Sequence, residues 1–244
     1  MAIWNPWRGC QKCSEGCLYC YIHRGDTKRN VDTTKIVKTD KFDLPIQKNK
    51  TGEYRLRKPG QIIYLCFSSD FLLAEVDKWR LVCFKMIKTR SDLNFLFLTK
   101  RIERFTKILP DDWGGGYNNV IVGVSVENQK TIDAKISILK TLPIKHKMII
   151  CQPLLESVDL SRYLEGIKLV VVGGESGKDA RPLNYDWVLA IREQCIAKNV
   201  PFEFRQCGTN FIKDGKLYVL PTKELIKQAK AAKIDYLTEK VLKN

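Results

Sequence analysis

After residue 60 the sequence rotates strictly between short apolar runs and longer amphipathic segments, and this rotation is its strongest constraint on the fold. Each apolar run is nearly continuous, as strands buried on both faces must be. Strand and helix in alternation are typical of parallel βα units joined by right-handed crossovers. The sequence therefore predicts an α/β fold with a parallel sheet, either open or closed into a partial (β/α)6-type barrel.

The apolar runs and the helical spacing between them place the expected elements. Strands are expected at 2–4, 61–67, 94–99, 119–124, 147–151, 168–172 and 201–204, and helices at 71–90, 102–109, 128–141 and 185–199. No linker divides the chain, so we expect one barrel domain over 1–215. The lysine-rich tail over 216–244 is expected to form a basic C-terminal capping helix.

One segment, 24–60, lies outside the rotation. Its stretch Arg24–Lys58 carries eleven basic and five acidic residues. Two interpretations stay open: a basic insertion over the mouth of the barrel, and a solvated loop.

The charge balance points to an anionic partner. The chain has 42 Lys and Arg against 27 Asp and Glu, a net charge of +15, which attracts polyanions such as DNA or RNA. A bland alternative is that the surplus serves solubility. No apolar run approaches the roughly 20 residues of a membrane span, so no membrane partner is expected. Nine cysteines and no secretory leader favour the reducing cytoplasm over a disulfide framework.

Polar residues follow five of the expected strands. In a parallel α/β domain, ligands bind beyond the carboxyl ends of the strands, so these residues are candidates for cofactor binding. Helix caps and turns are the alternative for Ser68 and Asn128 taken singly. Two adjacent glycines in "GGESG" let a backbone approach a ligand closely. The candidates are Ser68, Ser69, Asp70, Lys100, Arg101, Ser125, Glu127, Asn128, Gln152, Gly173, Gly174, Glu175 and Ser176.

Four cysteines lie within "CQKCSEGCLYC", at Cys10, Cys13, Cys17 and Cys20. Thiolates at this density suggest zinc or an iron-sulfur cluster. A structural zinc site built from two CxxC pairs usually separates them by a dozen or more residues, whereas closely spaced cysteines in one loop suit a cuboidal cluster. The spacing favours iron-sulfur.

The run Cys13-x3-Cys17-x2-Cys20, with Tyr19 before its last cysteine, resembles the radical SAM motif. The resemblance implies three cysteines that bind a 4Fe-4S cluster, and S-adenosylmethionine (SAM) on its fourth iron. It also implies a partial six-stranded parallel barrel.

A closer resemblance covers nearly the whole chain. The stretches "WNPWRGC", "SEGCLYCY", "FSSDFLL", "LTKR", "VSVENQ", "PLLESVDL" and "GGESGKDARPLNYDWV" are similar to the phage and prophage family of three-cysteine-motif, radical-SAM-like proteins. Members of that family occur beside a separate three-cysteine-motif partner protein. The family is distantly similar to spore photoproduct lyase, a DNA-repair enzyme.

This resemblance leaves the third cluster ligand open. In the family the cysteines fall at the positions of Cys10, Cys17 and Cys20, while the position of Cys13 is more often aliphatic. Spacing favours Cys13 and the family favours Cys10. A second departure is Gln152, where the family more often has glutamate, so a proton-handling role there is in doubt.

The radical SAM resemblance implies reductive cleavage of SAM to a 5′-deoxyadenosyl radical, here acting on a nucleic acid or nucleotide. It implies that Ser68, Ser69 and Asp70 receive the methionine amino group. It further implies that Ser125, Glu127 and Asn128 lie near the ribose and carboxylate, and 173–176 near the adenine. Lys100 and Arg101 are candidates to hold a carboxylate or phosphate, and a surface ion pair with Glu103 or Asp70 is the alternative. The rival from another class is a nucleic-acid-binding protein whose iron-sulfur or zinc site is only structural.

Overall fold

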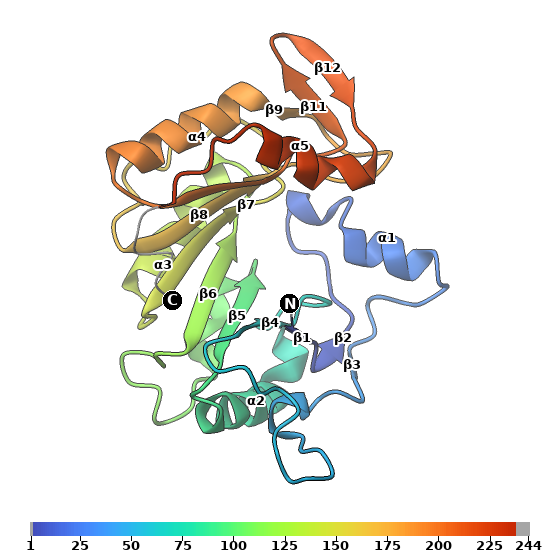
Figure 1. The fold of residues 1–244 in the computed structure, drawn as a ribbon, viewed down its shortest axis with the longest axis vertical. Coiled ribbons are helices and arrows are strands. Elements are labelled where there is room, and N and C mark those ends of the chain that lie inside the picture. Colours follow the sequence, from blue (N-terminus) through green and yellow to red (C-terminus); the bar gives the residue numbers. More distant parts are fainter. Residues whose placement is uncertain (1, 238–244) are drawn as a thin grey trace. The chain divides into compact units, whose positions relative to one another are not determined.

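A computed structural model describes residues 2–237 of the 244-residue chain. Its main sheet is parallel and has seven strands in the order β1-β4-β5-β6-β7-β8-β10, traced in Figure 1. The expected α/β class with a parallel sheet is confirmed. The strands are β1 Ala2–Trp4, β4 Ile62–Leu65, β5 Asn94–Thr99, β6 Val120–Ser125, β7 His146–Cys151, β8 Ile167–Gly173 and β10 Phe202–Gln206.

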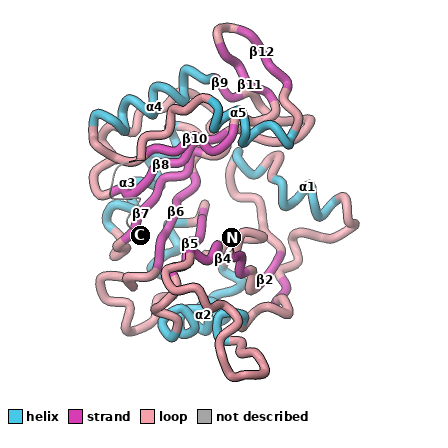
Figure 2. The backbone as a smooth tube through the Cα atoms, in the orientation of Figure 1, coloured by secondary structure: helices cyan, strands magenta, loops and turns pink. Residues whose placement is uncertain are grey.

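The α-helices are α1 Tyr21–Thr27, α2 Asp77–Thr89, α3 Gln129–Thr141, α4 Tyr185–Ala197 and α5 Leu225–Ala231, shown in Figure 2. Three of the four helices expected between strands are found as α2, α3 and α4, with α2 starting later than expected, whereas α1 was not expected. Between β5 and β6, where an α-helix was expected over 102–109, the chain forms the 3-10 helix η4 Ile102–Lys107. Pro110 lies just beyond and disfavours helical backbone in the residue before it, so the segment is too short for a regular α-helix.

The chain divides into two compact units whose segments alternate along the sequence, so no single linker separates them. Unit 1 comprises Met1–Lys12, Ile22–Gly123 and Thr141–His146, and unit 2 comprises Cys13–Tyr21, Val124–Lys140 and Lys147–Asn244. Unit 1 is built around aromatic rings: Trp7 stacks on Phe71 at 5.5 Å, and Phe71 meets Phe97 at 4.7 Å. Unit 2 packs α4 against β8 and β10 through fully buried residues such as Val188 and Ile191.

The basic segment 24–60 is tied into unit 1 by its main chain. Trp4 Nε1 donates to the carbonyls of Lys41 and Phe42, each at 3.1 Å. Arg90, 1% exposed, donates to the carbonyls of Pro45 and Leu56 and pairs with Asp92 at 2.8 Å. Arg90 stands just before β5, so the structure places the part of the insertion around 45–56 at the amino end of that strand. Of the two interpretations left open by the sequence, an insertion over the mouth at the carboxyl ends of the strands is not what this contact supports. Short elements within or beside this segment are β2 Trp7–Arg8, which pairs with β3 Val37–Lys38, and η2 Leu44–Ile46.

A second, three-stranded sheet lies in unit 2 in the order β12-β11-β9 and was not expected from the sequence. Its strands are β9 Leu183–Asn184, β11 Asn210–Lys213 and β12 Lys216–Val219. Asp214 and Gly215 have φ of 51° and 70°, the backbone of a type I′ hairpin turn. Residues 216–219 are therefore strand, where the capping helix was expected to begin. Helix is confined to η5 Thr222–Glu224 and α5, and 238–244 lie outside the described residues.

Within the described part of the chain, no helix is both long and apolar enough to cross a bilayer.

We expect Arg90→Met to destabilise the fold by about 2–3 kcal/mol, because two carbonyl acceptors lose their donors in a buried site. Arg57→Met is the matched control, since Arg57 makes an ion pair with Glu53 in which both side chains are more than half exposed, at 57% and 60%. Chemical denaturation of both variants measures the difference, and the control should lose less than about 0.5 kcal/mol. Equal losses would contradict an anchoring role for Arg90.

Candidate functional site

The cysteine loop of unit 2, residues 13–21, is a series of tight turns. Cys17 N–H donates to the Ser14 carbonyl at 3.0 Å, and Cys20 N–H donates to the Cys17 carbonyl at 3.4 Å. The 3-10 helix η1 Glu15–Cys17 forms between them. Cys13 is exposed, Cys17 is buried and Cys20 is half-buried. The turns therefore set Cys17 and Cys20 one turn apart.

Residues after β6 hold this loop by its backbone. The Glu127 carboxylate is fully buried and accepts the Gly16 N–H at 3.0 Å. Asn128 donates to the Glu15 carboxylate at 3.3 Å and accepts the Thr131 N–H at 3.0 Å, near the start of α3. The loop is thus fixed to the carboxyl end of β6 by two residues that the sequence assigned to SAM.

A second anchor comes from the loop after β8 and was missed by the sequence analysis. Glu175, 7% exposed, accepts from Arg181 Nε at 3.0 Å and from Arg181 Nη2 at 2.7 Å. The same Nη2 donates to the Glu15 carbonyl at 3.0 Å, and the guanidinium lies 5.4 Å from the ring centre of Tyr19. The sequence signal for this anchor was an arginine six residues after the glutamate of "GGESG". Hydrogen bonding to Glu175 raises the pKa of Arg181, so this cation is permanent.

The paired glycines of "GGESG" are explained by close approach within unit 2. A Cβ on Gly174 would lie 2.5 Å from the Cys207 carbonyl oxygen, and one on Gly173 would lie 3.0 Å from the Gln152 side chain. Gly208, with φ of +81°, meets Gly174 from the other side. Crowding by the chain itself therefore accounts for these glycines, where the sequence suggested approach to a ligand.

In unit 1, Asp70 connects the carboxyl ends of β4 and β5. The residue is buried, and its carboxylate accepts four hydrogen bonds at 2.8–3.0 Å. The donors are the hydroxyl of Thr99, the N–H groups of Leu72 and Lys100, and Nη1 of Arg101. The sequence left Arg101 open between ligand binding and a surface ion pair. It forms an ion pair with Asp70 that is largely buried, with side chains 11% and 6% exposed.

The segment leading to Cys10 is pinned by main-chain contacts in the same unit. The hydroxyls of Ser68 and Ser69 donate to the carbonyls of Trp7 and Gly9, and Arg101 donates to that of Gln11. Gly9 has φ of +91°, and a Cβ there would lie 2.3 Å from the Lys35 carbonyl oxygen, so only glycine fits. The backbone around Cys10 is therefore rigidly defined.

The remaining five cysteines differ from those of the loop. Cys66, Cys83, Cys151, Cys195 and Cys207 are at most 2% exposed. Burial raises the pKa of the Cys207 thiol to about 11 and that of Cys195 to about 12. None of the nine cysteines, all within residues 2–237, forms a disulfide. The exposed or half-buried cysteines are therefore Cys10, Cys13 and Cys20.

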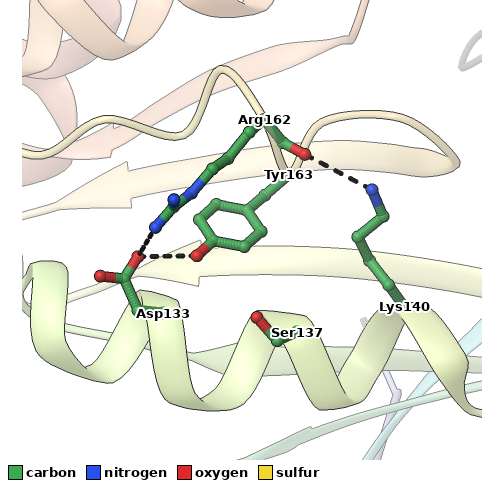
Figure 3. Close-up of a pocket in the computed structure, with 5 residues that line it drawn as sticks. All are labelled: Asp133, Ser137, Lys140, Arg162 and Tyr163. Carbon is green, nitrogen blue, oxygen red and sulfur yellow. Dashed lines mark hydrogen bonds and ion pairs between the residues drawn. The ribbon is translucent and has the colours of Figure 1, made fainter.

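A pocket of about 480 Å³ on unit 2 is a separate feature (Figure 3). Its polar groups bind one another: Asp133 accepts from Arg162 at 2.8 Å and from Tyr163 at 2.7 Å, and Lys140 donates to the Arg162 carbonyl at 3.4 Å. The hydrogen bond from Tyr163, followed by those from Gln129 and Arg162, lowers the pKa of Asp133 to about 2. The pocket lies between α3 and the loop that precedes β8.

Across residues 2–237, no three His, Cys, Asp or Glu side chains are grouped to hold one metal ion. The sequence-predicted ligands therefore form no ready mononuclear zinc site in the described chain. A cuboidal cluster makes a different demand, because each thiolate binds its own iron. The loop of residues 13–21 holds three soft thiols, of which Cys13 is exposed and Cys20 half-buried, and these match that demand in donor chemistry.

A family model matches residues 1–241, nearly the whole chain. The protein belongs to DUF5131. That family is described only as a protein of unknown function, so membership assigns no activity. No curated protein and no solved structure matches the DUF5131 chain.

We expect Arg181→Met in the DUF5131 chain to destabilise it by about 2–3 kcal/mol, because Glu175 is left buried without its partner. The cysteine loop should loosen as well, with amide exchange at Leu18 faster by about tenfold, since Glu15 and Tyr19 lose their anchor. Hydrogen-exchange mass spectrometry and chemical denaturation measure the two effects.

Arg162→Met is the control for this variant, because its ion pair with Asp133 is 65% and 43% exposed. It should cost less than about 1 kcal/mol and leave exchange in residues 13–21 unchanged. If amide hydrogen exchange in residues 13–21 is identical in Arg181→Met and wild type, Arg181 is not an anchor of the cysteine loop.

Proposed function

We propose that this DUF5131 protein is a radical SAM enzyme that acts on a nucleic acid or nucleotide. Cys17, Cys20 and one of Cys10 or Cys13 would hold a 4Fe-4S cluster. The finer fold assignment, a partial (β/α)6-type barrel, belongs to the same proposal. It is supported by the seven-stranded parallel sheet and by polar residues at the carboxyl ends of its strands.

The contrast between two classes of cysteine carries the proposal. Five thiols are buried core residues, while Cys10, Cys13 and Cys20 keep exposed surface within an eleven-residue stretch. The loop that holds Cys13, Cys17 and Cys20 is fixed by buried acids after β6 and β8. A loop that only needed to pack would bury its cysteines, as the core does.

Such a cluster, held by Cys17, Cys20 and one of Cys10 or Cys13, would supply the electron for reductive cleavage of bound SAM and so the means of abstracting hydrogen from the substrate. The chain's own residues supply orientation. Glu127 and Arg181 fix the loop backbone through Gly16 and Glu15, and Ser69 and Arg101 fix the residues on either side of Cys10.

The proposed SAM contacts are narrowed by this geometry. The Asp70 carboxylate already accepts four hydrogen bonds, and Glu175 accepts three from Arg181. We therefore propose that Asp70 and Glu175 hold the residues at the strand ends in place and do not bind SAM themselves. Gly173 and Gly174 are crowded by the chain itself, and the fully buried Glu127 holds Gly16, so these three are given the same positioning role. Direct contact with SAM is assigned to the remaining candidates, Ser68, Ser69, Lys100, Ser125, Asn128, Gln152 and Ser176.

Single Cys→Ala variants test the cluster. Anaerobically reconstituted wild type should carry about four irons per chain and release 5′-deoxyadenosine with SAM and dithionite. Cys17→Ala and Cys20→Ala should lose both. Of Cys10→Ala and Cys13→Ala one should lose both, which identifies the third ligand. Alkylation with mass spectrometry gives an independent readout, because the ligating thiols should be protected only in the loaded protein.

Cys83→Ala is the control, since this thiol is fully buried in unit 1 and should leave iron content unchanged. Stoichiometric zinc without iron would overturn the proposal. Loss of iron in both Cys10→Ala and Cys13→Ala would favour four protein ligands and a structural cluster. Iron without 5′-deoxyadenosine would favour the nucleic-acid-binding alternative.

Nucleic-acid binding is tested through the basic segment, where Arg55, Arg57 and Lys58 are exposed. The triple Ser variant should bind a DNA duplex more weakly and flatten the salt dependence by up to about 0.9 in log–log slope for each lost phosphate contact. Lys130→Ser/Lys140→Ser/Lys168→Ser has the same net charge and is the control. If the two triple variants show equal slopes in the salt dependence of binding, net charge drives binding and no localised surface is involved. Undetectable binding to DNA and RNA would count against a nucleic-acid substrate.

A further inference from the structure

The outer strand of the small sheet in unit 2 is unusually exposed. All four residues of β12, Lys216–Val219, are exposed, with Leu217 at 58%, Tyr218 at 44% and Val219 at 70%. Figure 1 shows β11 and β12 as a hairpin that extends beyond α4 and α5 of the same unit. Large apolar side chains gathered on one exposed strand cost free energy unless something covers them.

The register of the hairpin shows which backbone groups point outward. Lys213 pairs with Lys216 beside the two-residue turn, Ile212 with Leu217, and Asn210 with Val219. In an antiparallel ladder hydrogen-bonded and non-hydrogen-bonded pairs alternate, so Leu217 and Val219 direct their N–H and C=O away from β11. Within the described residues no strand pairs with this edge, because β12 is the end strand of its sheet.

The side chains of β12 fall on two faces. Tyr218 lies opposite Phe211, whose ring packs against Tyr185 at 5.7 Å and Phe204 at 6.2 Å in the interior of unit 2. Leu217 and Val219 lie on the other face. The edge thus offers a free hydrogen-bonding ladder together with an apolar face, which are the two features that strand addition uses.

The charge around this edge selects an acidic occupant. Residues 208–223 contain Lys213, Lys216 and Lys223 against the single acid Asp214, and all three lysines are exposed. A second copy of the chain is disfavoured, because each copy carries +15 and brings the same lysines. Lysine and short length alone would protect an edge strand from unwanted pairing, and neither requires exposed Leu217 and Val219.

We propose that β12 is a docking edge for an extended, acidic peptide segment of a protein partner, which adds as a fourth strand to the β12-β11-β9 sheet. The peptide backbone pairs with the outward groups of Leu217 and Val219. Its apolar side chains cover those two residues, and its acidic residues face Lys213, Lys216 and Lys223. A nucleic acid would use the lysines but has no need of the backbone ladder. The inference is independent of the proposed radical chemistry.

The probe is a displayed library of random twelve-residue peptides selected on the intact chain. Enriched peptides should alternate apolar residues and be rich in Asp and Glu. Hydrogen exchange of the wild-type chain with such a peptide should show new protection at the amides of Leu217 and Val219. The amide of Tyr218, already bonded to β11 in this register, should not change.

Val219→Pro removes one outward N–H without removing a bond to β11, as proline is tolerated at such edge positions. It should weaken peptide binding by about tenfold or more. Val219→Thr keeps the N–H and the β-branched shape and should bind within about twofold of wild type. Circular dichroism checks that both variants fold, and the exchange experiment on wild type does not depend on either.

Three results would overturn the proposal. The first is that no peptides are enriched. If an oligonucleotide binds in that case and the double substitution Lys213→Glu/Lys216→Glu abolishes its binding, the edge is assigned to nucleic acid. The second is peptide binding without new protection at Leu217 and Val219. The third is a concentration-dependent dimer of wild type that Val219→Pro abolishes, which would assign the edge to a second copy.

Discussion

A buried carboxylate must be surrounded by donors, and the ends of the strands in this protein are organised by that constraint. Burial of a charge costs several kcal/mol unless it is paired and hydrogen-bonded. Asp70 meets the constraint with four donors from the ends of β4 and β5. Glu127 draws in the Gly16 amide, and Glu175 draws in Arg181, which reaches Glu15. The segments around the cysteines are held because these acids need partners.

The same constraint explains why the sequence motifs identified residues near the cysteine segments but assigned them to ligand binding, whereas the structure shows them holding the chain. Polar residues after parallel strands were assigned to SAM because ligands bind at such ends. In the structure Ser69, Asp70, Glu127 and Glu175 all contact the chain itself, either at the residues around the cysteines or at the arginines that hold them. A residue that builds a site and a residue that touches a ligand have the same sequence signature, since both are polar and both follow a strand.

The parallel strands were predictable because apolar runs of three to seven residues leave few alternatives, and β5 and β1 match their expected ranges. The hairpin was missed although "KDGK" carries the Asp-Gly pair of a type I′ turn, because its strands are short and one is fully exposed. Arg181 was missed because its role as an anchor depends on Glu15 and Tyr19, which are distant from it in sequence. The division into two units was not predictable either, since their segments alternate along the chain.

The anchors of the cysteine segments reach main-chain atoms. Gly16 contributes its N–H, and Glu15, Gly9 and Gln11 contribute their carbonyls. Because backbone atoms are common to all residues, replacing a cysteine side chain leaves these contacts in place. The cost of such a replacement is then confined to what the sulfur itself does: packing, as for the buried core thiols, hydrogen bonding, as for Cys10 with the Gln11 carbonyl, or binding a metal. That separation makes ligation by Cys10 or Cys13 measurable apart from folding, and it arises because the loop is held through its backbone.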